Sequence, residues 1–558
     1  MTARATTIRY LAAVCLLPLI VLWRQDNILF TGYGYIDPWL YFGFFRDLAE
    51  FKRILLGNSV GEHLSWILPG AAVHKLLAPL AANCILHLGV HTLATVSLFL
   101  TLDWVVGSRR AFAATILFSL NPWVWFATAW DCADGVSIAY FLFTMALLTW
   151  AARSPVRRSI LLVAGMALAA LVYSDSDWIV LSPLLPLYYA GLVHAWHKTP
   201  LLQSGWVLCR WFGPGCVLVT MAFGAINYRL DGHFWFYASP VVELLQRNTS
   251  PAPWFYGLWH DGGLSYGLLF ALAGAAVSAV VLIREGLGAF RAGSPAALFS
   301  WLFLAALTWM VWRQLRGYPL LGSTGHVSIL LPFSFLAIGA GFWAELETAR
   351  PKYYLLFCCI AMAVLGYAWL DEGPILASGI PYAVWTGLAA LVASLVWRAA
   401  PENVICGLGG FFIFTALGVG PCYIGVDPHG YRDQYRALCQ ARARIEAVRH
   451  GQPVRFWFDK ADHAMPDAVA LVSSYSWDWV LGQSFDAPPC SQDPASSAII
   501  AAIASDPSHG AGFVASTLSA CWSGKGLRVV PAETDAIPRG ASGYSLSLLR
   551  VESVPGSR

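Results

Sequence analysis

Apolar runs of membrane-spanning length recur along the first 420 residues of the chain. A hydrocarbon core ~30 Å thick requires ~20 apolar residues in a helix, and somewhat shorter or longer runs are accommodated by tilt. Thirteen runs approach that length, near residues 8–23, 79–104, 110–128, 135–152, 158–174, 178–196, 205–226, 264–283, 296–312, 326–344, 353–370, 381–398 and 403–420. The pattern predicts an all-α polytopic membrane body with about thirteen transmembrane helices.

The pattern changes near Pro421, where polar residues become more frequent. Of the first 420 residues 42 are charged, against 25 of the last 138. We therefore expect a transmembrane domain over residues 1–420 and a soluble domain over residues 421–558. Periodicity within the second predicts an α/β domain, with helices near 431–450 and 497–505 and strands near 454–458, 527–530 and 544–551.

Composition supports a chain embedded mostly in lipid. The sequence is 58% hydrophobic and 12% charged, with a mean hydropathy of +0.59, whereas about a quarter of the residues in a soluble chain are charged. A net charge of +3 leaves no basic excess for a polyphosphate backbone, which argues against nucleic acid as a partner. No Walker or Rossmann glycine motif supports nucleotide-driven transport.

Basic residues in the short loops predict the orientation. With the N-terminus in the cytoplasm, the inner loops carry fourteen Lys and Arg residues and the outer loops nine, as the positive-inside rule requires. Thirteen crossings then place residues 421–558 outside the cytoplasm. In that oxidising compartment Cys490 and Cys521 can form a disulfide, although Cys422 and Cys439 allow three pairings and buried free thiols are an equal alternative.

Asp37 is the first carboxylate of interest in the outer loops. It directly precedes Pro38 and heads an amphipathic stretch that reaches about Leu56, which predicts an interfacial helix. An Asp before Pro is a good helix N-cap, and this alone can explain the residue. The functional interpretation is a general base, or a metal ligand, at the mouth of a membrane cavity.

Two further outer loops each carry a pair of carboxylates. Asp131 and Asp134 are three residues apart, so on a helical turn they point the same way. Asp175 and Asp177 lie at the junction of the fifth and sixth runs. Capping explains any one of these loops, but three acidic loops on one side of the membrane are harder to explain by capping alone.

Arg313 and Arg316 stand against the positive-inside trend, because they follow the ninth run on the outer side. Two arginines at positions i and i+3 can fork onto a phosphate. Anchoring to lipid headgroups, or pairing with the outer carboxylates, is an equally weighted alternative. His87 and His91, four residues apart in the second run, have no third metal ligand beside them, so a structural role is favoured.

These residues together resemble the C-type glycosyltransferase (GT-C) superfamily of polytopic membrane enzymes, which includes the protein O-mannosyltransferases and the lipid A aminoarabinose transferases. The resemblance covers residues 1 to about 420, best in the first two hundred. It rests on Tyr35-Ile36-Asp37-Pro38-Trp39 after the first run, on Leu64-Ser65-Trp66-Ile67-Leu68-Pro69-Gly70, and on Trp130-Asp131-Cys132-Ala133-Asp134-Gly135.

The resemblance implies transfer of a hexosyl or pentosyl group from a polyprenyl-phosphate donor to a glycan, lipid or protein acceptor. The reaction would occur on the outer face of a bacterial inner membrane, with the C-terminal domain in the periplasm. Asp37 inherits the role of general base, and Asp131 and Asp134 map to a second acidic position that holds the acceptor or a metal; Asp175 and Asp177 are further candidates for that position.

Arg313 and Arg316 match no motif of the superfamily, so their assignment to the donor phosphate rests on chemistry alone. A departing lipid phosphate needs charge compensation, which arginine or a divalent metal ion can provide. The sequence lacks an obvious third carboxylate of the metal-binding oligosaccharyltransferase pattern, which leaves the metal ion open.

A secondary transporter or lipid flippase of the cell envelope is the alternative function. Such a protein needs polar or broken spans near the middle of the membrane. Here the charged residues collect in the loops instead, which favours the transferase.

Overall fold

The computed structural model of the chain describes residues 3–24, 36–54, 59–119, 122–128, 132–153, 158–238, 241–242, 274–275, 277–283, 294–316, 328–342, 431–452, 454–459, 480–482, 490, 499–537 and 544–554. The chain divides into two compact units. The first comprises Met1–Phe30, Glu62–Pro69 and Ala78–Gly425; the second comprises Thr31–Gly61, Gly70–Leu77 and Val426–Arg558. The predicted domain boundary near residue 420 lies outside the described residues and stays a prediction.

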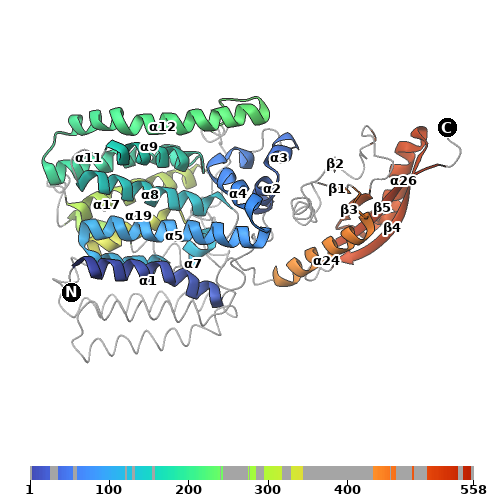
Figure 1. Cartoon of the computed structure of the whole chain (residues 1–558), viewed down its shortest axis with the longest axis horizontal. Coiled ribbons are helices and arrows are strands. Elements are labelled where there is room, and N and C mark those ends of the chain that lie inside the picture. Colours follow the sequence, from blue (N-terminus) through green and yellow to red (C-terminus); the bar gives the residue numbers. More distant parts are fainter. Residues whose placement is uncertain are drawn as a thin grey trace. The chain divides into compact units, whose positions relative to one another are not determined.

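The first unit is a bundle of apolar helices (Figure 1). Helices α12, α9, α8, α5 and α1 are successive neighbours across it. Its elements are α1 (Ala3–Arg24), α5 (Pro79–Val106), α6 (Ser108–Ser119), α7 (Pro122–Thr128), α8 (Ala133–Arg153), α9 (Arg158–Val172), α10 (Trp178–Leu181), α11 (Leu184–His197), α12 (Leu201–Asp231), α17 (Pro295–Leu315), α19 (Leu330–Ala337) and the π-helical turn η3 (Ile338–Phe342).

Five of the described helical segments are long and apolar enough to cross a membrane, which supports a multi-pass membrane protein. They are Ala81–Val106, Ala133–Arg153, Trp178–His197, Leu201–Asp231 and Pro295–Leu315. The expected number of about thirteen stays a prediction, because the runs at 353–370, 381–398 and 403–420 lie outside the described residues.

Two of the predicted runs are interrupted by proline. The run at 110–128 consists of α6 and α7, and α7 begins at Pro122. The run at 178–196 consists of α10 and α11, separated by Ser182 and Pro183. Proline lacks an amide hydrogen and restricts the preceding residue, so it favours the start of a helix over its interior. Hydropathy alone does not detect these breaks.

Glycines bring α9 and α12 into backbone contact. A Cβ placed on Gly165 would lie 2.0 Å from the Phe212 carbonyl oxygen, and one on Gly215 would lie 2.1 Å from the Leu162 carbonyl oxygen. The Cys216 thiol also donates to the Gly165 carbonyl at 3.2 Å. Small residues of this kind allow transmembrane helices to approach closely where no hydrophobic driving force exists between them.

The amphipathic stretch after the first run forms two helices instead of one. Helix α2 (Ile36–Arg46) and α3 (Leu48–Ile54) are separated at Asp47, and a 3-10 turn, η2 (Ser59–Glu62), precedes α4 (Leu64–Leu76). Phe44 and Phe45 are buried, and Phe45 packs where a Cβ on Gly70 would lie. Aromatic packing within the second unit therefore fixes the fold of this segment.

The C-terminal part of the second unit contains a five-stranded mixed sheet in the order β2-β1-β3-β5-β4. Its strands are β1 (Val454–Asp459), β2 (Val480–Gly482), β3 (Ile499–Ala504), β4 (Leu527–Ile537) and β5 (Tyr544–Ser553). β1 pairs in parallel with β2 and β3, whereas β5 is antiparallel to both β3 and β4. This result confirms the predicted α/β domain with its strands near 454–458, 527–530 and 544–551, and α24 (Tyr431–Arg449) confirms the predicted helix.

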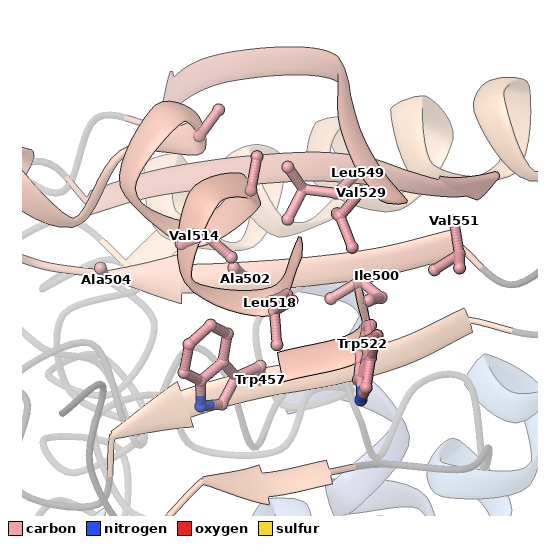
Figure 2. Close-up of a cluster of buried hydrophobic side chains, with 12 residues drawn as sticks. Trp457, Ile500, Ala502, Ala504, Val514, Leu518, Trp522, Val529, Leu549 and Val551 are labelled. Carbon is pink, nitrogen blue, oxygen red and sulfur yellow. The ribbon is translucent and has the colours of Figure 1, made fainter. Parts of the chain in front are cut away.

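Helix α26 (Ala511–Trp522) covers one face of this sheet and forms the main core with it. Val514, Leu518 and Trp522 of α26 meet Trp457 and Ile500 of the sheet (Figure 2). A disulfide between Cys490 and Cys521, with the Cα atoms 5.0 Å apart, joins the end of this helix to the segment between β2 and β3. The structure therefore selects the Cys490–Cys521 pairing.

The helix predicted at 497–505 is wrong, because this segment is the central strand β3. All six residues from Ile499 to Ala504 are buried. Alanine favours a helix intrinsically, but a strand buried on both faces reads as a continuous apolar run. Tertiary burial overrides the local propensity, and a helix that was not predicted from the sequence, α26, follows β3.

Candidate active site

Asp37 lies in the first turn of α2 and is exposed. The helix begins at Ile36, one residue before Asp37, so the side chain occupies the first turn and not the N-cap position expected from the Asp-Pro sequence. A carboxylate in the first turn is still favourable toward the helix dipole. Asp37 belongs to the second unit, whereas the other described candidate carboxylates belong to the first.

Asp134 is buried in the first turn of α8. The following residue, Gly135, is packed on α7, since a Cβ there would lie 2.2 Å from the Ala127 carbonyl oxygen. The dipeptide Asp134-Gly135 therefore allows the start of α8 to lie directly on the end of α7, which positions the carboxylate. Asp131 lies outside the described residues.

Asp175 and Asp177 share a tight turn between α9 and α10. The Asp177 amide donates to Asp175 Oδ1 at 2.9 Å, and the Trp178 amide donates to the Asp175 carbonyl at 3.3 Å. Asp177 is buried at the start of α10, where its side chain makes no capping hydrogen bond. Capping therefore does not account for the Asp177 carboxylate.

Arg313 pairs with Asp177. The arginine lies in the last turn of α17, its Nη2 is 3.7 Å from Asp177 Oδ1, and the two side chains are only 4% and 7% exposed. Its guanidinium also lies 5.7 Å from the centre of the Trp309 ring. Arg313, predicted to bind the donor phosphate, is thus adjacent to Asp177, predicted to help position the acceptor or a metal. The two residues are 136 positions apart in the sequence.

Arg316 has different surroundings from Arg313. It is the exposed C-cap of α17, and its guanidinium lies over the exposed Trp312 ring at 5.5 Å. Residues three apart on a helix neighbour each other, but here one arginine is buried and the other is at the surface.

Tyr237 and Glu62 extend the group around Asp175 and Asp177. Tyr237 follows α12, is buried, and donates from its hydroxyl to the Val172 carbonyl at 2.5 Å. Burial raises the pKa of Tyr237 well above its ordinary value, and the nearby negative charges of Asp175, Glu62 and Asp177 raise it further. The phenol therefore stays protonated and can act as a hydrogen-bond donor.

We refer to Glu62, Asp175, Asp177, Tyr237 and Arg313 as the acid–arginine cluster. Asp175, Asp177 and Arg313 were predicted from the sequence, whereas Glu62 and Tyr237 were not. Glu62 lies two positions before Leu64, where a segment that carries part of the superfamily resemblance begins, and it is buried, which is unusual for a carboxylate. Its position near that motif was the feature of the sequence from which Glu62 could have been predicted as a site residue.

Of the two histidines of α5, His91 has a structural role that its contacts define. His91 is buried, contacts the hydroxyls of Thr128 at 3.0 Å and Ser119 at 3.1 Å, and stacks on the Trp125 ring. Within the described ranges, no group of three His, Cys, Asp or Glu side chains is arranged to hold a metal ion.

Solved structures with the same architecture exist. The chain aligns over 98% of its length, and over 98% of theirs, with the aminoarabinose transferase ArnT of Cupriavidus metallidurans bound to undecaprenyl phosphate and in its apo state. The TM-scores are 0.59 and 0.55, at 12% and 13% sequence identity. The chain therefore shares the fold of ArnT. The resemblance drawn from the sequence is thereby confirmed at the level of the fold.

More distant similarity is found to the oligosaccharyltransferase AglB of Archaeoglobus fulgidus, in complex with an inhibitory peptide and a dolichol-phosphate. It shares 12% identity over 86% of this chain and 65% of that one, with a TM-score of 0.42, which is too low to support an inference. Neither a protein-family model nor a curated protein matches the sequence.

Proposed function

We propose that the protein is a membrane glycosyltransferase that uses a sugar linked to polyprenyl phosphate. The GT-C fold supports this class, and the ArnT structure of the same architecture was obtained with undecaprenyl phosphate bound. A hexosyl or pentosyl group would pass to a glycan, lipid or protein acceptor. Charged groups inside a membrane protein are costly and are therefore usually functional.

The buried Arg313–Asp177 pair is the observation that carries the proposal. It joins the end of α17 to the start of α10, and Tyr237 after α12 reaches the same cluster. A guanidinium among carboxylates at the end of an apolar bundle offers a cation for a lipid phosphate and hydrogen-bond acceptors for a polar acceptor molecule.

In the proposed reaction the acceptor oxygen attacks the anomeric carbon of the donor sugar. The bond from that carbon to the phosphate oxygen breaks, and polyprenyl phosphate leaves with the electron pair. Asp37 takes the proton of the attacking hydroxyl as general base. Arg313 offsets the charge that develops on the leaving phosphate, while Asp134, Asp175 and Asp177 orient the acceptor. Asp131 and Arg316 remain candidates for the acceptor and phosphate sites, respectively.

We further propose that this end of the bundle faces the periplasm of a bacterial inner membrane. The distribution of basic residues favours that orientation. The Cys490–Cys521 disulfide agrees with an oxidising compartment for the C-terminal domain.

Reconstituted protein tests the reaction directly. Proteoliposomes that contain the full chain would be supplied with a bacterial extract of glycosylated polyprenyl phosphates and acceptors, and released polyprenyl phosphate would be measured by mass spectrometry. We expect release by the wild type and a loss of at least about a thousandfold in Asp37→Asn, because a carboxamide cannot accept the proton. Asp47→Asn, in the break between α2 and α3, is the matched control and should retain activity.

The role of Arg313 is tested by the lipid that co-purifies with the protein. We expect polyprenyl phosphate to be enriched with the wild type and lost from Arg313→Gln, while Arg316→Gln loses less. Arg313→Lys keeps the positive charge and should retain part of the lipid. This variant therefore distinguishes loss of the charge from misfolding as the cause of lipid loss. No enrichment in the wild type, together with no turnover, would favour a transporter instead.

A further inference from the structure

Two arginines from different helices share one tryptophan on α9 and α12. Arg158, the first residue of α9, has its guanidinium 4.9 Å from the centre of the Trp211 ring. Arg210 of α12 lies 5.6 Å from the same centre. The two helices lie side by side (Figure 1). We refer to Arg158, Arg210 and Trp211 as the arginine–tryptophan site.

The length of α9 places this site at the membrane boundary opposite the acid–arginine cluster. At 1.5 Å per residue the helix rises ~21 Å between Arg158 and Val172, and the Val172 carbonyl accepts a hydrogen bond from the hydroxyl of Tyr237 in the cluster. A hydrocarbon core is ~30 Å thick. In the orientation proposed above, the arginine–tryptophan site lies in the cytoplasmic leaflet, at the level where Trp and Arg commonly occur.

The charges of the site have no acidic counterpart within the described part of the chain. Arg158 and Arg210 are both exposed, and the ion pairs there involve other arginines. Two guanidinium groups close to one ring repel each other. The face of the indole attracts each cation, but an anion that contacts both would neutralise them.

Beyond Trp211, the membrane-facing side of α12 offers an apolar surface. Val217, Leu218 and Met221 are all at least half exposed. They follow Trp211 by six to ten positions, which is ~9–15 Å along the helix toward the middle of the membrane. Along α12, a cationic site is thus followed by an apolar surface. A ligand with a charged phosphate and hydrocarbon chains matches this arrangement.

We propose that the arginine–tryptophan site binds the phosphate of an anionic phospholipid. The two guanidinium groups fork onto the phosphate oxygens, and the acyl chains lie along α12. Basic sites between transmembrane helices on the cytoplasmic side are suited to such headgroups. This binding site is separate from the proposed glycosyltransferase site and does not depend on that activity.

Lipid titration followed by native mass spectrometry tests the proposal. The full-length protein, delipidated in detergent, would be titrated with phosphatidylglycerol and, separately, with phosphatidylcholine. We expect the double variant Arg158→Gln/Arg210→Gln to bind phosphatidylglycerol at least about tenfold more weakly than the wild type, since each basic residue contributes to the attraction. Binding of phosphatidylcholine should not change.

Arg153→Gln is the matched control. Arg153 is exposed at the same end of the bundle and lies 6.0 Å from one ring, that of Trp104, which no second arginine of the described residues approaches. It should bind phosphatidylglycerol like the wild type. If the double glutamine variant is unstable, Arg158→Lys/Arg210→Lys should show an intermediate loss, because lysine keeps the charge but lacks the fork.

Three results would overturn the proposal. Equal phosphatidylglycerol binding by the wild type and the double variant would show that the two arginines do not bind the lipid. An equal loss of binding in Arg153→Gln would show that the lipid responds to general surface charge and not to this site. Displacement of bound phosphatidylglycerol by equimolar polyprenyl monophosphate would show that the site prefers a different phosphate lipid.

Discussion

Helix α12 of the bundle and the C-terminal domain place large apolar side chains in opposite positions. On α12 of the bundle, Leu202 is 90% exposed and Trp206 is 68% exposed, whereas Trp457 and Trp522 of the C-terminal domain are almost completely buried. Water drives apolar groups together in the C-terminal domain, but lipid is as apolar as leucine and provides no such force between helices. The same residue types therefore stabilise the C-terminal domain from its core and face lipid on α12.

In the bundle, the contribution of apolar cores is partly replaced by close backbone packing. The contact between α9 and α12 depends on Gly165 and Gly215, each of which faces a carbonyl oxygen of the other helix. The packing of α9 on α12 thus depends on small residues, whereas α26 packs on the sheet of the C-terminal domain through large ones such as Leu518 and Trp522.

Gly165→Leu is expected to have the largest effect on stability. The new Cβ would lie 2.0 Å from the Phe212 carbonyl oxygen and 2.9 Å from the carbonyl carbon, and backbone atoms cannot move aside without separating the helices. Overpacking a well-packed core, where side chains can shift, costs about 1–3 kcal/mol, so a clash with the backbone should exceed ~4 kcal/mol and prevent assembly. The yield of monodisperse protein in detergent measures the effect.

Gly205→Leu is the control, because a Cβ at Gly205 meets nothing within 4 Å. Both variants add the same apolar side chain to the same pair of helices. Equal yields from the two variants would show that close backbone contact does not hold α9 and α12 together.

Trp522→Ala is expected to destabilise the C-terminal domain by about 4 kcal/mol, the usual cost of removing a buried aromatic side chain. Trp522 lies in the core beside Leu518 and Ile500 (Figure 2). Trp206→Ala on α12 removes an equally large side chain but one that faces lipid, so it should cost less than ~1 kcal/mol. Thermal unfolding of both variants, followed by near-ultraviolet circular dichroism, compares them. Equal destabilisation would contradict the contrast between the two regions.

The fold could be predicted from the sequence more accurately for the helical bundle than for the C-terminal domain. Hydropathy located α5, α8, α12 and α17 within a few residues, because a membrane span must be long, apolar and helical. It did not find the break at Pro122 or the division of α10 from α11. In the C-terminal domain, Ile499–Ala504 was misassigned because its structure depends on β1 and β5 at its sides and not on its own sequence.

The candidate site was predictable only as a set of separate residues. Asp177 and Arg313 could each be selected from loop position and charge, but their pairing arises from the packing of α10 and α17. Glu62 and Tyr237 join them through a turn and a helix end that hydropathy does not describe. The roles of Asp37, Asp134 and Arg316 stay predictions, as does that of Asp131, which lies outside the described residues.

The disulfide is expected to contribute less than the Trp522 side chain. Cys490 and Cys521 are 31 positions apart, and closing a loop of that length in the unfolded chain corresponds to about 3.7 kcal/mol, slightly less than the cost expected for Trp522→Ala. Cys490→Ser/Cys521→Ser should lower the stability of the C-terminal domain by that amount and leave the bundle unchanged. Cys209→Ser, which alters an exposed thiol of α12, is the control. A lower melting temperature of the bundle in the double variant would contradict an effect confined to the C-terminal domain.

The smallest effect is expected at the exposed pair of Arg528 and Glu552 on β4 and β5. Their Nη2 and Oε2 atoms are 2.9 Å apart, closer than the 3.7 Å between Arg313 and Asp177, but the side chains are 54% and 35% exposed. Exposed pairs contribute about 0–1 kcal/mol because water and salt screen them, whereas removal of one partner from a buried pair costs about 3–5 kcal/mol. Arg528→Gln should therefore shift the denaturant midpoint by less than the equivalent of ~0.5 kcal/mol, and Arg313→Gln by far more. If the two losses were equal, the distance between the charges, and not their burial, would determine the stability of ion pairs in this protein.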